Sequence, residues 1–153
     1  MNIAYHKELS VFTEVPENKE LSILYSLNQQ NIPEVGELAS INSLSKLINM
    51  STVNFYVLED NEIIGFVICF REGSEYKSPN YRYFKNKEVK FLYIDRVVIK
   101  ESHRRRGAGS YLYDCLDDLA KKEGIPLCCE VNILPRNEIS LSFHYKKGFK
   151  DDG

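Results

Sequence analysis

"SHRRRGAGSYLYDC", residues 102–115, places three arginines directly before Gly-Ala-Gly and an amphipathic segment directly after it. The N-terminus of a helix leaves N–H groups without partners and carries partial positive charge, so after a strand it forms an anion site. Gly107 and Gly109 would let the backbone approach a phosphate with no Cβ in the way. Further positive charge comes from Arg104, Arg105 and Arg106. The stretch predicts a helix N-terminus that holds a di- or polyphosphate mainly by backbone amides.

Two familiar phosphate loops do not fit this stretch. No lysine and hydroxyl follow the glycines, as a G-x-x-x-x-G-K-[ST] loop requires, and Leu112 stands where the last glycine of G-x-G-x-x-G belongs. Taken alone, "RRRGAG" is equally consistent with a solvated basic loop and a glycine-rich turn, so the surrounding elements have to decide.

Composition limits the class of protein. The 153 residues suit one domain over 1–153, and the net charge of -2 with a pI of about 6.0 argues against a nucleic-acid partner. No apolar run approaches the roughly 20 residues that span a bilayer, so we expect no membrane partner and a cytoplasmic protein. The four cysteines form no C-x-x-C pair and are expected to be free thiols, with no metal site.

The elements around the stretch indicate a mixed α/β (α+β) fold. A strand over 89–100, a helix over 107–123 and a strand over 125–133 form a crossover, which implies a parallel strand pair. Upstream, β-branched and aromatic runs on both sides of Asp60 and Asn61 predict a hairpin. The remaining expected elements are a weak strand within 3–15, helices over 18–30, 37–50 and 136–147, hairpin strands over 53–59 and 63–71, and a long loop over 72–88.

In this context "R-x-x-G-x-G" at 104–109 resembles the acyl-CoA signature of the GNAT superfamily of N-acyltransferases. A second motif stands at the distance that the family uses, in Asn137, Ser140, Gly148 and Phe149. The resemblance covers nearly the whole chain from residue 18, and "YIDRVVI", "PLCCEVN" and "FHYKKGF" are similar to an uncharacterised bacterial subgroup of predicted acetyltransferases. It implies a central mixed, mostly antiparallel sheet with a parallel splayed pair, flanked by helices.

The resemblance also implies acetyl-CoA as co-substrate and a binding path for it. The strand before the signature would offer backbone groups to the pantetheine arm, and the amides after it would hold the pyrophosphate. Asn137 would contact the pantetheine or order the loop beneath it, or serve only as a helix cap. The implied contacts are Val97, Val98, Ile99, Arg104, Arg105, Arg106, Gly107, Ala108, Gly109, Ser110 and Asn137.

The family's reaction, attack by an amine on a thioester, needs a base and benefits from an acid. Many members carry a Tyr as the acid where this chain has His144, with Tyr145 next to it. Adjacent helix positions differ by about 100°, so the two cannot point the same way; we favour His144, which could instead be a packing residue. For the base we consider Asp95, Glu130 or a water chain.

Strand alternation puts Asp95 on the same face as Val97 and Ile99, and for Asp95 we favour an ion pair with a core-facing arginine over a role as base. Near the acceptor amine, the resemblance places the loop over 72–88 and the two N-terminal helices. Residues that could shape the acceptor site are Arg71, Tyr81, Tyr83 and Phe84.

The chain stops at "GFKDDG", where the family normally adds a final strand, so a C-terminal strand is expected to be missing. A partner chain in a homodimer, the first strand, or residues beyond a truncation would each cover the open sheet edge. The leading function is an acetyl-CoA-dependent N-acetyltransferase acting on an amine of a small molecule or protein. The alternatives are a non-catalytic CoA-binding module and a site for another phosphorylated ligand.

Overall fold

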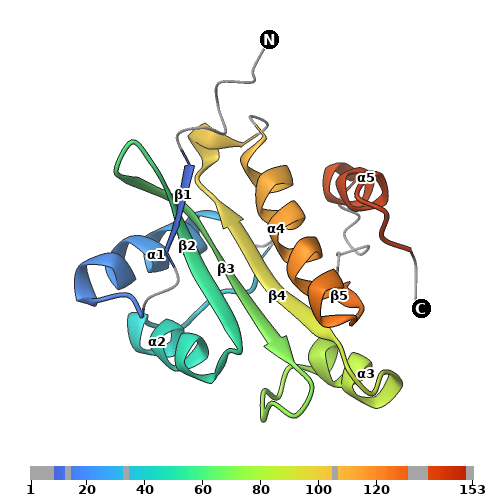
Figure 1. Ribbon diagram of the computed structural model, residues 1–153. Helices are drawn as coiled ribbons and strands as arrows, with labels where there is room; N and C mark the ends of the chain where they lie inside the picture. The colour runs from blue at the N-terminus through green and yellow to red at the C-terminus, as the bar shows by residue number, and fades with distance from the viewer. Residues whose placement is uncertain (1–8, 13–14, 33–34, 105–106, 131–137, 151–153) are drawn as a thin grey trace.

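A five-stranded sheet forms the centre of the computed structural model, which describes residues 9–12, 15–32, 35–104, 107–130 and 138–150 (Figure 1). The strands lie in the order β1–β2–β3–β4–β5, and all neighbours are antiparallel except the parallel pair β4–β5. This is the mixed sheet expected from the sequence. The strands are β1 (Leu9–Phe12), β2 (Val53–Glu59), β3 (Glu62–Arg71), β4 (Leu92–Ile99) and β5 (Leu127–Cys129).

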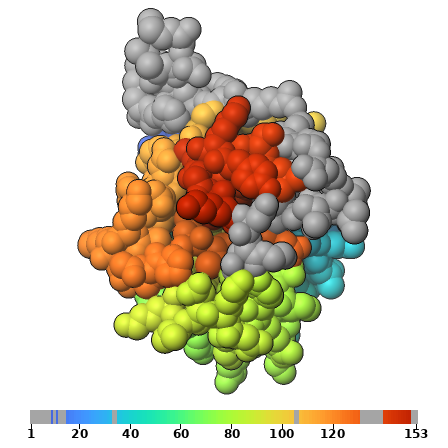
Figure 2. Space-filling model, turned by 90° about the vertical axis from the view of Figure 1, so that its right-hand side faces the viewer, coloured from blue at the N-terminus to red at the C-terminus, as the bar shows by residue number. Residues whose placement is uncertain are grey.

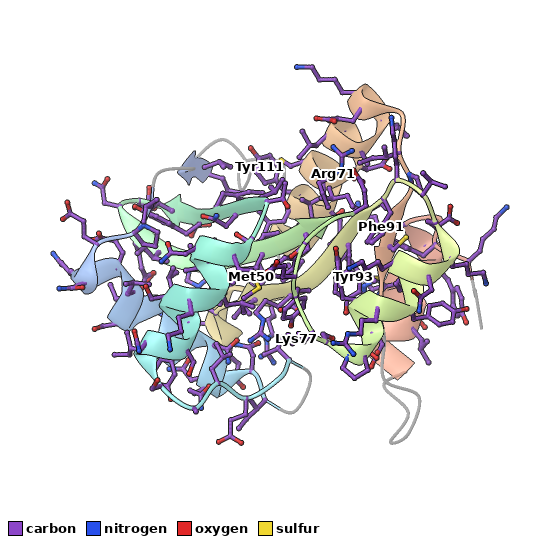
Figure 3. The ribbon with its side chains drawn as sticks, turned by 90° about the horizontal axis from the view of Figure 1, so that it is seen from below. Met50, Arg71, Lys77, Phe91, Tyr93 and Tyr111 are labelled. Atoms are coloured by element: carbon purple, nitrogen blue, oxygen red, sulfur yellow. The ribbon has the colours of Figure 1, made fainter. Side chains whose placement is uncertain are left out.

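Helices cover both faces of the sheet (Figure 3). On one face α1 (Asn18–Gln30), α2 (Ile41–Met50) and α3 (Pro79–Lys87) bury a cluster that includes Leu24, Leu44 and Phe66. On the other face α4 (Ala108–Glu123) buries a second cluster. The last helix, α5 (Glu138–Lys146), packs beside α4 and forms much of the surface seen in Figure 2.

The hairpin and the N-terminal helices follow the predicted pattern closely. Asp60 and Asn61 both have positive φ, 50° and 66°, which is the backbone of a two-residue hairpin turn. The second helix starts at Ile41 rather than 37, because the Ser40 side chain accepts a hydrogen bond from the Ser43 amide at 3.1 Å and caps it.

The predicted loop over 72–88 is wrong in its second half, which forms α3. Pro79 stands in the first turn, where its fixed φ suits a helix start. Tyr81 is fully buried and Phe84, three residues later, packs against the same cluster. The helix was not predicted because most of its residues are polar, and only Tyr81 and Phe84 contact the core.

The strand β4 contains a bulge at Asp95. Its neighbours Ile94 and Arg96 pair with Cys69 and Ile68 of β3, so the ladder passes over Asp95. The expectation that Asp95 shares a face with Val97 and Ile99 is therefore wrong. Val97 and Ile99 pack with the cluster under α4, whereas Asp95 bonds to groups on the opposite face.

Three further predictions from the sequence concern membrane spans and metal sites, the cysteines and the edge of the sheet. Within the described ranges, no helix is long and apolar enough to cross a membrane, and no group of three or more His, Cys, Asp or Glu could hold a metal ion. All four cysteines are free, with Cys69 buried and the others half-buried. The first strand β1 pairs with β2 at the far edge of the sheet, so it does not cover β5.

Candidate functional site

The N-terminus of α4 has the features of an anion site. Its cap residue Gly107 has a left-handed backbone, with φ 92°, which favours glycine. Glycine has no side chain to cap a helix, and the first turn of α4 carries no acidic residue. Within the described part of the chain no side chain caps the first N–H groups, and the helix dipole favours an anion there. Arg105 and Arg106 lie outside the described residues.

The first turn of α4 is also tied to α5. Ala108 is buried, and a Cβ added at Gly109 would meet only the Phe143 ring at 4.0 Å, an ordinary contact. The Ser110 carbonyl accepts a hydrogen bond from Lys147 Nζ at 3.2 Å, and the same ammonium lies 2.8 Å from Asp114 Oδ1. Gly107, rather than Gly109, is thus the glycine that the backbone requires.

Two basic residues before the site are fixed by hydrogen bonds to other elements. The Arg104 guanidinium donates to the Asn31 side chain at the end of α1. His103 is buried, with Nε2 3.3 Å from Glu59 Oε1 and Nδ1 2.9 Å from Ser102 Oγ. These contacts fasten the segment between β4 and α4 to α1 and to the β2–β3 hairpin.

The two parallel strands are paired over only part of their length. Pairing of β4 with β5 ends at Ile94 with Cys129, while β4 continues to Ile99 against β3. Among the described residues no strand pairs with 95–99 on the β5 side; we call 95–99 the open edge of β4. Val97, Val98 and Ile99 lie on this edge, and its backbone groups lead toward the N-terminus of α4. Their predicted contact with pantetheine stays a prediction.

Asp95 belongs to a buried polar network on the face opposite α4. Tyr76 donates its hydroxyl to Asp95 Oδ1 at 2.6 Å, and Arg96 Nε donates to Oδ2 at 2.7 Å. The side chains of Asp95 and Arg96 are 6% and 7% exposed. This is the ion pair with a core-facing arginine that was the alternative to a catalytic base. Both carboxylate oxygens are engaged, so Asp95 is poorly placed to accept a proton from a substrate.

The network extends from Arg96 to the connection between α1 and α2. Arg96 Nη1 donates to Asn28 Oδ1 at 2.7 Å and to the Gly36 carbonyl at 3.1 Å. Asn28 is fully buried and also donates to Gly36. Sequence reasoning missed Tyr76 and Asn28, because their partners lie 19 and 68 residues away in the chain.

Glu130, directly after β5, has a different environment. Its side chain is exposed, and partial burial raises the pKa of its carboxyl group. Among the described residues it has no hydrogen-bond or ion-pair partner. A carboxylate that is accessible and has a raised pKa is suited to accept a proton.

The two candidate acids lie on different sides of α5. His144 is buried; its Nδ1 is 2.7 Å from the Ser140 carbonyl, which can only accept, so Nδ1 donates and Nε2 accepts from the Tyr113 hydroxyl at 2.7 Å. Burial lowers the pKa of His144, although the hydrogen bond to Ser140 opposes this. The Tyr145 side chain is 48% exposed. Asn137, the predicted start of this helix, lies outside the described residues.

The predicted acceptor-site aromatics are mostly structural. Tyr81 is fully buried, donates to the Arg71 carbonyl at 2.7 Å and accepts from the Ser74 amide at 3.0 Å. Arg71 pairs with Glu72 and Glu123. Tyr83 is exposed and meets the Phe84 ring edge to face at 5.0 Å.

Comparisons with known proteins agree with this fold. The model of the acetyltransferase (GNAT) family matches residues 20–149. The structure resembles the aminoglycoside N-acetyltransferase AAC(6')-Iy, solved with a CoA-containing bisubstrate analogue (16% identity, 95% of this chain, 92% of the other, TM-score 0.68). It also resembles an aminoglycoside acetyltransferase from an uncultured soil metagenomic sample, solved with sisomicin (15% identity, 96% of this chain, 93% of the other, TM-score 0.64). A third similar structure is a transcriptional regulator from Bacillus halodurans (16% identity, 95% of this chain, 96% of the other, TM-score 0.69). Identities this low show a shared fold.

Proposed function

Because the chain belongs to the acetyltransferase (GNAT) family, we propose that it transfers the acetyl group of acetyl-CoA to an amine of a small molecule or protein. The observation that carries the proposal is the placement of the uncapped N-terminus of α4 next to the open edge of β4. The first supplies N–H groups for the pyrophosphate, and the second supplies unpaired backbone groups for the pantetheine arm. CoA-bound neighbours support the same co-substrate.

In the proposed reaction the amine nitrogen attacks the thioester carbonyl carbon. A C–N bond forms, the C–S bond breaks and CoA leaves as a thiolate. An alkylammonium has a pKa near 10.4, so a base must first take a proton from it. We assign this role to Glu130 rather than Asp95, because Asp95 is held by Tyr76 and Arg96. For the proton that the thiolate receives, the exposed Tyr145 is favoured over His144, whose two ring nitrogens are engaged.

The binding half of the proposal is tested with a matched pair of glycines at the two ends of α4. Gly107 and Gly124 both have left-handed backbones, with φ 92° and 68°. Aspartate strains the backbone at either position, but only at Gly107 would its carboxylate face the pyrophosphate. We expect Gly107→Asp to weaken CoA binding at least about 100-fold, because like charges in one site cost several kcal/mol.

Isothermal titration of both variants with CoA and with acetyl-CoA checks this expectation. Gly124→Asp should bind within about twofold of the wild type, since each 1.4 kcal/mol is tenfold and no ligand charge lies near that end. Equal affinity of the folded Gly107→Asp variant and the wild type would exclude α4 as the pyrophosphate site.

A second candidate function is a CoA-binding module without catalysis. It is favoured by the engagement of both His144 nitrogens, since His144 stands where many family members carry the acid. The two functions differ in turnover. Release of CoA from acetyl-CoA in the presence of an amine panel, aminoglycosides included, supports the transferase, whereas tight binding without release supports the module.

A further inference from the structure

The hydroxyl group of Tyr93 is unusual among the buried tyrosines. Tyr93 is 3% exposed, and its ring packs against Tyr81 and Phe84 at centroid distances of 5.8 Å for both. Among the residues that the structure describes, none hydrogen-bonds its hydroxyl group. The Tyr93 hydroxyl does not belong to the buried side-chain atoms that lack a partner, so with none among the described residues it is in contact with solvent, whereas the Tyr81 hydroxyl has two protein partners. The Tyr93 hydroxyl therefore has unused hydrogen-bonding capacity.

Tyr93 lies near Glu130, the residue assigned as the base. It pairs with Cys128 in the parallel ladder, and Glu130 follows two residues later, on the same face by alternation. In Figure 3 it lies next to α3 on the face of the sheet away from α4. Burial raises the pKa of Tyr93 first, and the charges of Asp95 and Glu130 raise it further, so the phenol stays neutral.

The charges on this face indicate what a neutral phenol could contact. Asp95 is neutralised by Arg96 at 2.7 Å, and Glu130 is the carboxylate near Tyr93 for which no described residue supplies an ion-pair partner. The Glu130 carboxylate can pair with one ammonium group of the acceptor, and this is the nitrogen that reacts. A second polar group on the acceptor would then meet the phenol, which suits a neutral hydroxyl better than a second ammonium.

We infer that Tyr93 determines acceptor specificity: its hydroxyl group hydrogen-bonds a neutral polar group of the acceptor, so that the preferred acceptors are amino alcohols rather than alkyl monoamines or diamines. This inference rests on the proposed transferase function. It assigns a binding role to Tyr93 and leaves proton transfer to Glu130.

Three amines of equal size test the inference: 2-aminoethanol, propylamine and 1,2-diaminoethane. We expect the wild type to show a kcat/KM for 2-aminoethanol about fivefold to tenfold above the other two, the value of one neutral hydrogen bond. Tyr93→Phe should remove this preference and leave the Kd for CoA unchanged. Tyr81→Phe is the matched control, because its hydroxyl bonds only to the protein, and it should keep the preference.

Thermal unfolding separates a binding role from a structural one. Tyr93→Phe removes a hydroxyl that bonds to no residue in the described part of the chain, so its Tm should equal or exceed that of the wild type. Tyr81→Phe loses two hydrogen bonds and should unfold about 2–4 °C lower or more. A Tyr93→Phe variant that unfolds as early as Tyr81→Phe, or that retains the amino-alcohol preference, overturns the inference while the transferase function stands. Absence of turnover with every amine in a CoA-binding protein overturns both.

Discussion

The two faces of the sheet are held together by different means. Under α4 the buried residues are mainly aliphatic or small, such as Ile64, Leu112 and Leu116. Under α1, α2 and α3 an apolar cluster is joined by aromatic rings and by the Tyr76–Asp95–Arg96–Asn28 network. The proposed CoA site uses backbone groups at the end of α4, while the proposed acceptor chemistry uses side chains on the polar face. Backbone amides are positioned by the helix itself, so a site built from them needs only apolar packing beneath it. A site built from side chains also needs hydrogen bonds that fix each side chain.

Arg96→Ala is expected to lower the free energy of unfolding more than any other substitution considered below. The substitution leaves Asp95 and Asn28 buried without their shared partner, and breaking a buried ion pair costs about 3–5 kcal/mol of unfolding free energy. Urea unfolding measures this cost. The matched control is Arg71→Ala, whose pairs with Glu72 and Glu123 are partly exposed and are worth about 1 kcal/mol or less. Equal costs for the two variants would show that the network does not hold the polar face.

An intermediate effect is expected from one methylene removed on each face. Ile64 and Ile68 are both fully buried on β3, Ile64 toward α4 and Ile68 toward α1. Each Ile→Val substitution should lower the unfolding free energy by about 0.5–1.5 kcal/mol. Similar values would show that apolar packing is equally tight on both faces, so that the polar network is the difference between them. A much smaller loss at Ile68, measured by the same urea titration, would contradict this.

The smallest effect is a pH dependence from His144, on the outer side of α4. Burial lowers its pKa in the folded state below 6.5, so below pH 6.5 the unfolded chain binds more protons. Its contribution to stability is fully present above pH 6.5 and is lost as pH falls toward the folded pKa. The urea midpoint should therefore drop between pH 7.5 and 5.5.

His144→Gln is the control for this pH dependence, since glutamine can still accept from Tyr113 but does not titrate in that range. The drop should be smaller in the variant. A midpoint that falls equally in both proteins would assign the pH dependence to other groups.

The sequence predicts most of the fold, because periodicity and turn residues act locally. Asp60 and Asn61 indicate the hairpin, and the repeated leucines indicate α1. The helix α3 was missed because only Tyr81 and Phe84 of its nine residues pack into the core, too few to give a helical pattern. The helix start at Gly107 was predictable for the same local reason, since a glycine run after a strand is visible in the sequence, and the anion site proposed there stays a prediction.

The polar face was not predictable in the same way. Arg96 and Asn28 meet across 68 residues, and neither has a neighbour in sequence that indicates the contact. The alternation rule also failed at Asp95, because a bulge in one strand depends on how its partner pairs. Contacts set by the tertiary fold decided which of two plausible carboxylates, Asp95 or Glu130, is accessible.

The bulge at Asp95 has a consequence for insertions and deletions. As the extra residue of β4, Asp95 shifts the phase of the strand by one position, and Val97 and Ile99 reach the core under α4 only after that shift. Deletion of this residue would restore regular alternation and turn both side chains to the opposite face. The fold therefore constrains the chain length at this point, in addition to the identity of the residue, which the buried pair with Arg96 fixes.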